Sequence, residues 1–169
     1  RQRPRSATLP QLLAAAVEAN PDGHAVIAAD ATWTYREIDE RSSRLARELM
    51  SRGIGTESVV ALAITRSAQS ILSVWAVAKT GAAYVPVDPN YPADRIEYML
   101  SDSGAALGIT TAEFLPSVSL QGGPEWVVLD DPETMAAVDG QTSEPVTYAD
   151  RLRTVTPLNT AFSVSYTHL

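Results

Sequence analysis

VWAVAKTGAAYVPVDPNYPADRIEYMLSDSGA, residues 74–105, is the stretch of sequence that decides the fold. Its first part continues an apolar run from Ile71 and is apolar on all sides, which predicts a helix covered by protein. Lys79 falls in the last turn of this helix and Gly81 lies just past it, where a cation and a left-handed residue favour helix termination. We therefore expect Gly81 to adopt a positive φ at the end of a buried helix.

A short strand and a second helix follow within the same stretch. The β-branched and aromatic residues at 83–87 predict a strand, and Pro86 places it near a sheet edge or a strand end. Pro92 suits the first position of the next helix, and Gly104 suits its end. The apolar face of this helix carries Ile96, Met99 and Leu100. Strand, helix and strand in alternation are typical of βαβ units.

The rest of the chain repeats this alternation. Thr8 and Gln11 form a capping box that begins a helix over Leu9–Ala19, and Asp131 with Pro132 favours another helix start. Further strands are predicted at 25–28, 31–34, 58–64, 106–110 and 126–129, and a short helix at 112–118. Because parallel strands are joined by right-handed helical crossovers, the pattern predicts an α/β fold with a mainly parallel sheet flanked by helices.

A second capping box, Thr34 with Glu37, begins an amphipathic helix that Gly53 ends. Its apolar face carries Ile38, Leu45, Ala46, Leu49 and Met50. Its charged residues are expected to point largely elsewhere: Arg41, Arg44, Arg47 and Glu48. We interpret Tyr35, Glu37, Tyr84 and Asp88 as packing, capping or turn residues, because the local position of each accounts for it.

Two blocks resemble core motifs of the adenylation domains of nonribosomal peptide synthetases. Residues 78–103, AKTGAAYVPVDPNYPADRIEYMLSDS, are similar to the second core motif, with Thr80 where alanine is usual. Residues 33–39, WTYREID, are similar to the first core motif, and Arg66-Ser67 also matches the family. The resemblance is dense over residues 8–105 and thins beyond them. It implies the flavodoxin-like N-terminal layer of the adenylate-forming fold.

The resemblance also implies a function for the parent protein. Such an enzyme activates an amino acid with ATP and Mg²⁺ to an aminoacyl adenylate, releasing pyrophosphate. It then loads the product on the phosphopantetheine thiol of a carrier (thiolation) domain, next to an upstream condensation domain. Residues 1–169 are expected to be the N-terminal part of the adenylation domain, truncated before the phosphate-binding loop and inactive alone, with residues 1–8 as a linker.

The resemblance assigns one ATP-binding residue, Thr167. The family's Gly-rich phosphate loop begins Tyr-Thr-Ser-Gly, and here Tyr166-Thr167 match before the pattern breaks at His168. No catalytic residue and no metal ligand is expected in the chain. Lys79 belongs to the scaffold motif and is not the mobile catalytic lysine of the family.

Other candidate sites have weaker patterns. His24 and His168 lack metal-ligand spacing. Asp130-Asp131 at a strand end is the best generic metal or ligand site, although Pro132 after it favours a helix start. Two alternatives to amino-acid activation stay open: an acyl-CoA or aryl-acid ligase of the same fold, and a non-catalytic α/β binding module.

Composition sets outer limits on the function. The chain has 169 residues, 45% hydrophobic and 20% charged, which is typical of a globular domain. Its net charge of -7 comes from scattered acidic residues without a Lys/Arg run, so we expect no nucleic-acid partner. No stretch approaches the roughly 20 apolar residues of a membrane span, so we expect no membrane association. The absence of cysteine excludes disulfides and thiol catalysis and fits a cytoplasmic protein.

Overall fold

A four-stranded parallel sheet lies at the centre of this computed structural model, which describes residues 6–147 and 149–151. Its strands are β3 (Val59–Leu62), β4 (Ala83–Pro86), β5 (Leu107–Thr110) and β6 (Glu125–Val128). They lie in the order β4-β3-β5-β6, and each neighbouring pair is parallel. The first strand of this sheet in sequence, β3, therefore lies between the second, β4, and the third, β5, as in flavodoxin-like sheets. The predicted fold class is confirmed.

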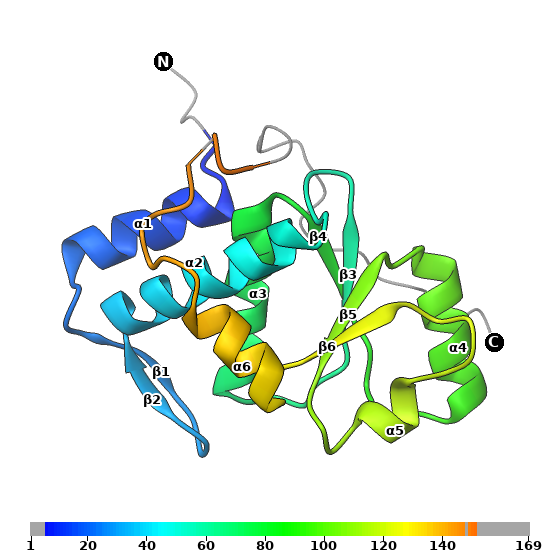
Figure 1. The fold of residues 1–169 in the computed structure, drawn as a ribbon. Coiled ribbons are helices and arrows are strands. Elements are labelled where there is room, and N and C mark those ends of the chain that lie inside the picture. Colours follow the sequence, from blue (N-terminus) through cyan, green and yellow to red (C-terminus); the bar gives the residue numbers. More distant parts are fainter. Residues whose placement is uncertain (1–5, 148, 152–169) are drawn as a thin grey trace.

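Helices cover both faces of the sheet (Figure 1). One face carries α2 (Tyr35–Ser51) and α3 (Ala68–Thr80), with α1 (Leu9–Ala19) and α6 (Pro132–Asp139) packed on α2. The opposite face carries α4 (Ala93–Ser103) and the short α5 (Leu115–Val118). Beside these layers, β1 (His24–Ile27) and β2 (Thr32–Thr34) form a separate antiparallel pair that contacts α2.

Alternation along the strands divides the core between the two faces. On β3, Val60 and Leu62 belong to the cluster under α2 and α3, whereas Ala61 belongs to the cluster under α4 and α5. Ile96 of α4 and Val118 of α5 are fully buried in that second cluster. Successive side chains of a strand point to opposite faces, so a sheet covered on both sides needs apolar residues at every position.

The buried helix predicted from residues 74–105 is α3. Its N-cap is Ser67, whose hydroxyl accepts a hydrogen bond from the Ser70 backbone N–H at 3.2 Å. Gly81 ends it with φ 87°, in the left-handed region that residues other than glycine rarely adopt. Of its residues, Ile71 alone is exposed, and only by 37%. Both the burial of this helix and the conformation of Gly81 are confirmed.

Element boundaries differ from the prediction in small ways. Pro92 is the N-cap of α4 instead of its first residue, because its ψ of 147° is extended rather than helical. The predicted helix at 112–118 shortens to α5, since a turn in which Phe114 and Leu115 donate to the Thr111 carbonyl comes first. The observed strands are shorter than the predicted ones, as β3 shows against the predicted 58–64. Single backbone hydrogen bonds, such as that from the Ala63 N–H to the Ile109 oxygen, still extend the pairing beyond the strand ends.

The prediction for the charged residues of α2 was wrong in part. Arg41 is exposed, but Arg44 and Arg47 are half-buried and Glu48 is 9% exposed. The periodicity of α2 shows which side faces the sheet but not that α6 and the chain after it pack on a second side of the helix. Contacts from a distant part of the sequence therefore bury residues that local pattern assigns to solvent.

Candidate functional site

The carboxyl edge of the parallel sheet is the first place to look for a site, because ligands of open α/β sheets bind there. A cleft of about 330 Å³ opens at this edge, between the loops that follow β3 and β4. Asp88 shapes one wall, since its Oδ1 accepts the Asn90 backbone N–H at 2.9 Å and closes a tight turn. Arg66 and Thr65 line the opposite wall. The cleft is shallow and its polar groups come largely from the two loops.

Carboxylates near this edge are engaged by the protein's own backbone. Asp130 Oδ1 accepts the Ala112 N–H at 2.8 Å, and Asp131 is the N-cap of α6 through the Thr134 N–H at 3.2 Å. Asp30 Oδ1 accepts the Ala68 N–H at 2.9 Å, and this bond lowers the pKa of the carboxyl group. The helix-start interpretation of Asp131 is confirmed. Within the described ranges, no group of acidic, histidine or cysteine side chains is placed to hold a metal ion.

Lys79 lies in a buried polar cluster between α2 and α3. Its Nζ lies 2.7 Å from Asp39 Oδ1, 2.9 Å from the Asp39 carbonyl oxygen and 2.9 Å from Ser43 Oγ. These three oxygens match the three N–H donors of an ammonium group. The Lys79 side chain is only 7% exposed, and its burial lowers the pKa of the ammonium group although Asp39 opposes that effect.

This arrangement makes Lys79 a structural tie between two helices. An amine with all its donors engaged by protein acceptors is not presented to a substrate. The assignment of Lys79 to the scaffold agrees with this geometry. The sequence predicted that the helix carrying Lys79 is covered by protein, but it did not predict the pairing of Lys79 with Asp39, which lies 40 positions away.

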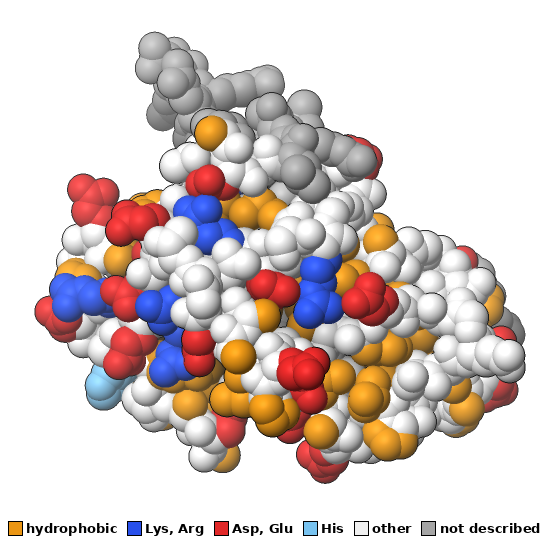
Figure 2. All heavy atoms as spheres, viewed as in Figure 1, with side chains coloured by type: hydrophobic (Ala, Val, Ile, Leu, Met, Phe, Trp, Pro, Cys, Tyr) orange, Lys and Arg blue, Asp and Glu red, His pale blue; other side chains and the backbone are white. Residues whose placement is uncertain are grey.

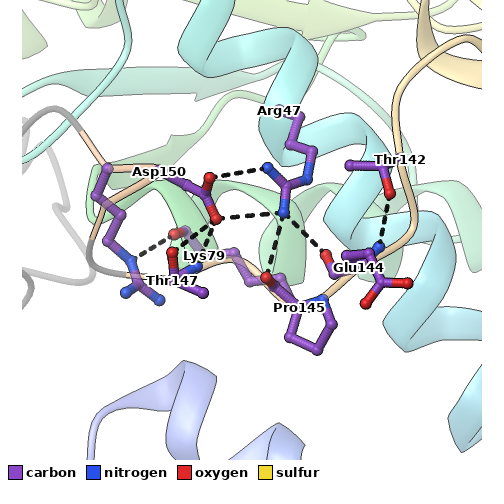
Figure 3. A network of polar contacts seen from close by, with 8 residues as sticks. Arg47, Lys79, Thr142, Glu144, Pro145, Thr147 and Asp150 are labelled. Atoms are coloured by element: carbon purple, nitrogen blue, oxygen red, sulfur yellow. Dashed lines mark hydrogen bonds and ion pairs between the residues drawn. The ribbon is translucent and has the colours of Figure 1, made fainter.

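A second polar network surrounds Arg47 of α2 (Figure 3). One of its terminal nitrogens donates to the carbonyl oxygens of Glu144 at 3.1 Å and Pro145 at 3.2 Å. The guanidinium group also pairs with the Asp150 carboxylate at 3.2 Å from each terminal nitrogen. Hydrogen bonds from Thr147 and the Arg47 guanidinium lower the pKa of Asp150 to about 2. A guanidinium group suits this site because it presents several donors in one plane.

The two networks meet at Arg151. Its Nε donates to the Lys79 carbonyl oxygen at 3.0 Å. A pocket of about 200 Å³ opens beside this contact, between the start of α1 and the chain before Arg151, and Asp39 and Lys79 contribute to its wall. In Figure 2, basic and acidic side chains are intermingled over the part of the surface where Figure 1 places α2 and α6. Two arginines form ion pairs here: Arg47 of α2 with Asp150, and Arg52, the C-cap of α2, with Glu48 and Glu125.

The predicted site residues are distributed unevenly. Thr167, the residue assigned to ATP, lies outside the described residues, as do Tyr166 and His168. His24 lies exposed at the start of β1. Glu37 completes the capping box of α2, with Oε2 2.8 Å from the Thr34 nitrogen.

Comparison with known proteins identifies a family and its fold. The family described as AMP-binding enzyme matches residues 13–167. The dimodular nonribosomal peptide synthase of Bacillus subtilis (strain 168) is 38% identical over 158 residues, which are 94% of this chain and 7% of that protein. Tyrocidine synthase 3 of Brevibacillus parabrevis is 43% identical over 109 residues, 64% of this chain and 2% of that protein. The chain thus spans a small part of these relatives.

Solved structures share the fold. The nonribosomal peptide synthetase FmoA3, in a form bound to α-methyl-L-serine-AMP, superposes with a TM-score of 0.81 at 21% identity. That match covers 95% of this chain and 17% of the other. The N-terminal subdomain of Klebsiella oxytoca NpsA, in complex with 3-hydroxybenzoyl-AMSN, gives 0.74 at 25% identity over 94% of this chain and 37% of the other. Within the described ranges, no helix has the length and apolar character that crossing a bilayer requires.

Proposed function

The chain belongs to the family of AMP-binding enzymes, and from this premise we propose that it is the N-terminal part of an amino-acid-activating adenylation domain. The observation that carries the proposal is 38% identity to a dimodular nonribosomal peptide synthase over 94% of the chain. The match covers only 7% of that synthase, which supports the proposal that residues 1–169 are one part of a longer enzyme. The described residues supply the α/β scaffold on which such a domain is built.

The proposed reaction has two steps. A carboxylate oxygen of the amino acid attacks the α-phosphorus of ATP, and pyrophosphate leaves to give the aminoacyl adenylate. The phosphopantetheine thiol of a carrier domain then attacks the acyl carbon, loses its proton and displaces AMP. A condensation domain upstream would use the loaded carrier. Catalysis of the first step depends on positioning and on stabilising charge at phosphorus.

Within this reaction the chain itself contributes mainly structure. Thr167 is proposed to contact ATP, on the resemblance of Tyr166-Thr167 to the start of the phosphate loop. Among the described residues, no group of three or more acidic, histidine or cysteine side chains is placed to hold a metal ion. We propose that residues 1–169 alone are inactive, because a single hydroxyl contributes about 1 kcal/mol, whereas millimolar binding needs about 4 kcal/mol.

The test is amino-acid-dependent exchange of labelled pyrophosphate into ATP by the complete enzyme. We expect exchange with one or a few amino acids, and none from residues 1–169 alone. An incubation without a carboxylic acid is the control for background exchange. Exchange by residues 1–169 alone would contradict the proposed inactivity.

An aryl acid is the second candidate substrate, and the NpsA subdomain bound to a 3-hydroxybenzoyl compound favours including it. The same assay is run with hydroxybenzoates and with fatty acids. Exchange with an aryl or fatty acid and with no amino acid would replace the proposed substrate class while leaving the adenylation chemistry in place.

A further inference from the structure

The parallel sheet has two edge strands, β4 and β6, and they differ in what protects their outer sides. Edge strands present unpaired backbone groups, and proteins commonly block them with proline, charge or a covering element. At β4 the N–H groups of Ala83 and Val87 donate toward β3, at 3.0 and 2.9 Å, so Pro86 occupies an outward position and carries no donor there. β6, with the sequence EWVV, contains no proline and no basic residue. The outer side of β6 is therefore the less protected of the two edges.

Backbone groups of alternate residues in β6 point to opposite sides of the strand. The Leu129 N–H, just past the strand, donates to the Thr110 oxygen of β5 at 3.0 Å, so the backbone groups of Trp126 and Val128 face outward. The Val128 oxygen accepts the Asp131 N–H at 3.1 Å. The N–H groups of Trp126 and Val128 and the Trp126 carbonyl oxygen have no hydrogen-bond partner among the described residues. The outer side of β6 thus offers both donors and an acceptor.

Apolar side chains border this edge on both faces of the sheet. Val127 is fully buried in the cluster under α2 and α3, and Trp126 packs in the cluster under α4 and α5. The Trp126 ring covers Gly108 of β5, where any side chain would collide with it. Trp126 and Val128 are only half-buried. In Figure 2, hydrophobic side chains gather on the part of the surface where Figure 1 places β6 and α5. Free backbone groups with an apolar border are what an added β-strand recognises.

We propose that the outer side of β6 is an interface at which a further strand, from another part of the same enzyme, joins the sheet. The backbone of that strand accepts from the N–H groups of Trp126 and Val128 and donates to the Trp126 carbonyl. β-Branched or aromatic side chains suit it, because they pack beside the apolar residues of β6. The inference rests on the proposed function in one respect, namely that residues 1–169 are one part of a longer enzyme.

The small size of this edge favours a strand of the same polypeptide over a separate molecule. β6 has four residues, and its few outward groups form too few hydrogen bonds to offset the freedom that two separate molecules lose on association. A segment tethered in the same polypeptide avoids most of that loss, because its effective concentration at the edge is high. A second copy of the enzyme, pairing edge to edge through β6, is the alternative occupant that the experiments have to separate from the tethered strand.

The first test is residue-resolved hydrogen–deuterium exchange of the complete wild-type enzyme. Gly122, in the exposed turn before β6, is the reference for an amide open to solvent, and Val127, which faces β5, is the reference for a paired amide. We expect the N–H groups of Trp126 and Val128 to exchange at least about a hundredfold more slowly than that of Gly122, as paired amides do. Faster exchange than this at either residue would overturn the inference.

The second test places a proline at the outward position of β6 in the complete enzyme. Val128→Pro removes the outer N–H and puts a ring where the added strand would lie, while the hydrogen bonds to β5 use other residues. Val128→Thr is the matched control, because threonine keeps the N–H and the branched shape. We expect Val128→Pro to accelerate exchange of the Trp126 N–H about tenfold or more, and Val128→Thr to leave it unchanged. No acceleration in Val128→Pro, or equal acceleration in both variants, would contradict the proposed pairing. If Val128→Pro yields little folded protein, the wild-type comparison decides.

Protein concentration separates the tethered strand from a second copy. We expect the protection of Trp126 and Val128 to stay the same over about a hundredfold range of enzyme concentration, because pairing within one polypeptide does not depend on it. Protection that rises with concentration, together with a dimer in sedimentation, would assign the edge to a second copy and overturn the inference. None of these measurements involves catalysis. Failure of the amino-acid proposal shows in pyrophosphate exchange, and failure of this inference shows only in the exchange of the β6 amides.

Discussion

The two faces of the sheet are stabilised in different ways. On the α4 and α5 side, the buried helix residues are all apolar: Ile96, Leu100 and Val118. On the α2 and α3 side, apolar residues share the interior with three polar side chains, those of Ser43, Glu48 and Lys79. Lys79 of α3 donates to Ser43 of α2, and Glu48 accepts a hydrogen bond from Gln141. The apolar face depends on contacts that any well-shaped hydrocarbon can make. The polar face depends on specific partners, so a single substitution there can leave a buried group unpaired.

The largest effect is expected on the apolar face. Ile96→Ala removes a fully buried side chain from the cluster under α4, and the cavity should cost about 3 kcal/mol of unfolding free energy. Urea unfolding of the protein measures this loss. Tyr98→Ala in the same helix is the control, because Tyr98 is 47% exposed and its removal should cost less than about 0.5 kcal/mol. Equal losses for both would show that α4 contributes to stability mainly as a helix and not through its buried side.

A smaller loss is expected when the central tie of the polar face is removed. Lys79→Met keeps an unbranched chain but leaves the Asp39 carboxylate without its cation, at a cost of about 2 kcal/mol in urea unfolding. The loss stays below that of a fully buried pair because the Asp39 side chain is 25% exposed and reaches water. Stability unchanged by Lys79→Met would mean that apolar packing alone joins α2 to α3.

A double-mutant cycle tests whether Lys79 and Asp39 act together. Lys79→Met with Asp39→Ala should cost about as much as Lys79→Met alone, since the second substitution removes a group that the first has already left unpaired. Additive losses would contradict the pairing seen in the structure.

The apolar face and the fold could be predicted from the sequence because their signals are local. The spacing of Ile96 and Leu100 marks the buried side of α4, and a glycine marks the end of the buried helix at Gly81. The parallel sheet followed from the alternation of strands and helices, whereas the order of its strands was not predicted. The ends of elements were less accurate, as at Pro92, because one dihedral angle decides whether a residue is counted as helical.

The polar face could not be predicted because its partners lie far apart in the chain. Arg47 and Asp150 are 103 positions apart, and Lys79 and Asp39 are 40 apart. Arg47 and Asp150 each have the sequence pattern of a solvent-exposed helix or loop residue, and the pattern around Lys79 predicts a covered helix but not the partner of its ammonium group. Nothing in the local pattern distinguishes Arg41, which is exposed, from Arg47, which binds residues 144–150. The resemblance assigned a role to Thr167, and that role stays a prediction.

The smallest effect is a pH dependence at the edge of the polar face. Because hydrogen bonds from Thr147 and Arg47 hold the pKa of Asp150 near 2, below its ordinary value of 3.8, the folded state favours the ionised carboxylate. The contribution of Asp150 is therefore complete above about pH 5 and disappears as the pH falls through 3.8 toward 2. Asp150→Asn should lower stability by less than about 1 kcal/mol at pH 6, because the pair is partly exposed. Urea midpoints of the wild-type and Asp150→Asn proteins, measured in steps below pH 5, should converge, because the substitution leaves every other carboxylate in place. A gap that stayed constant as the pH fell to 3 would show that Asp150 acts through its shape in the turn and not through its charge toward Arg47.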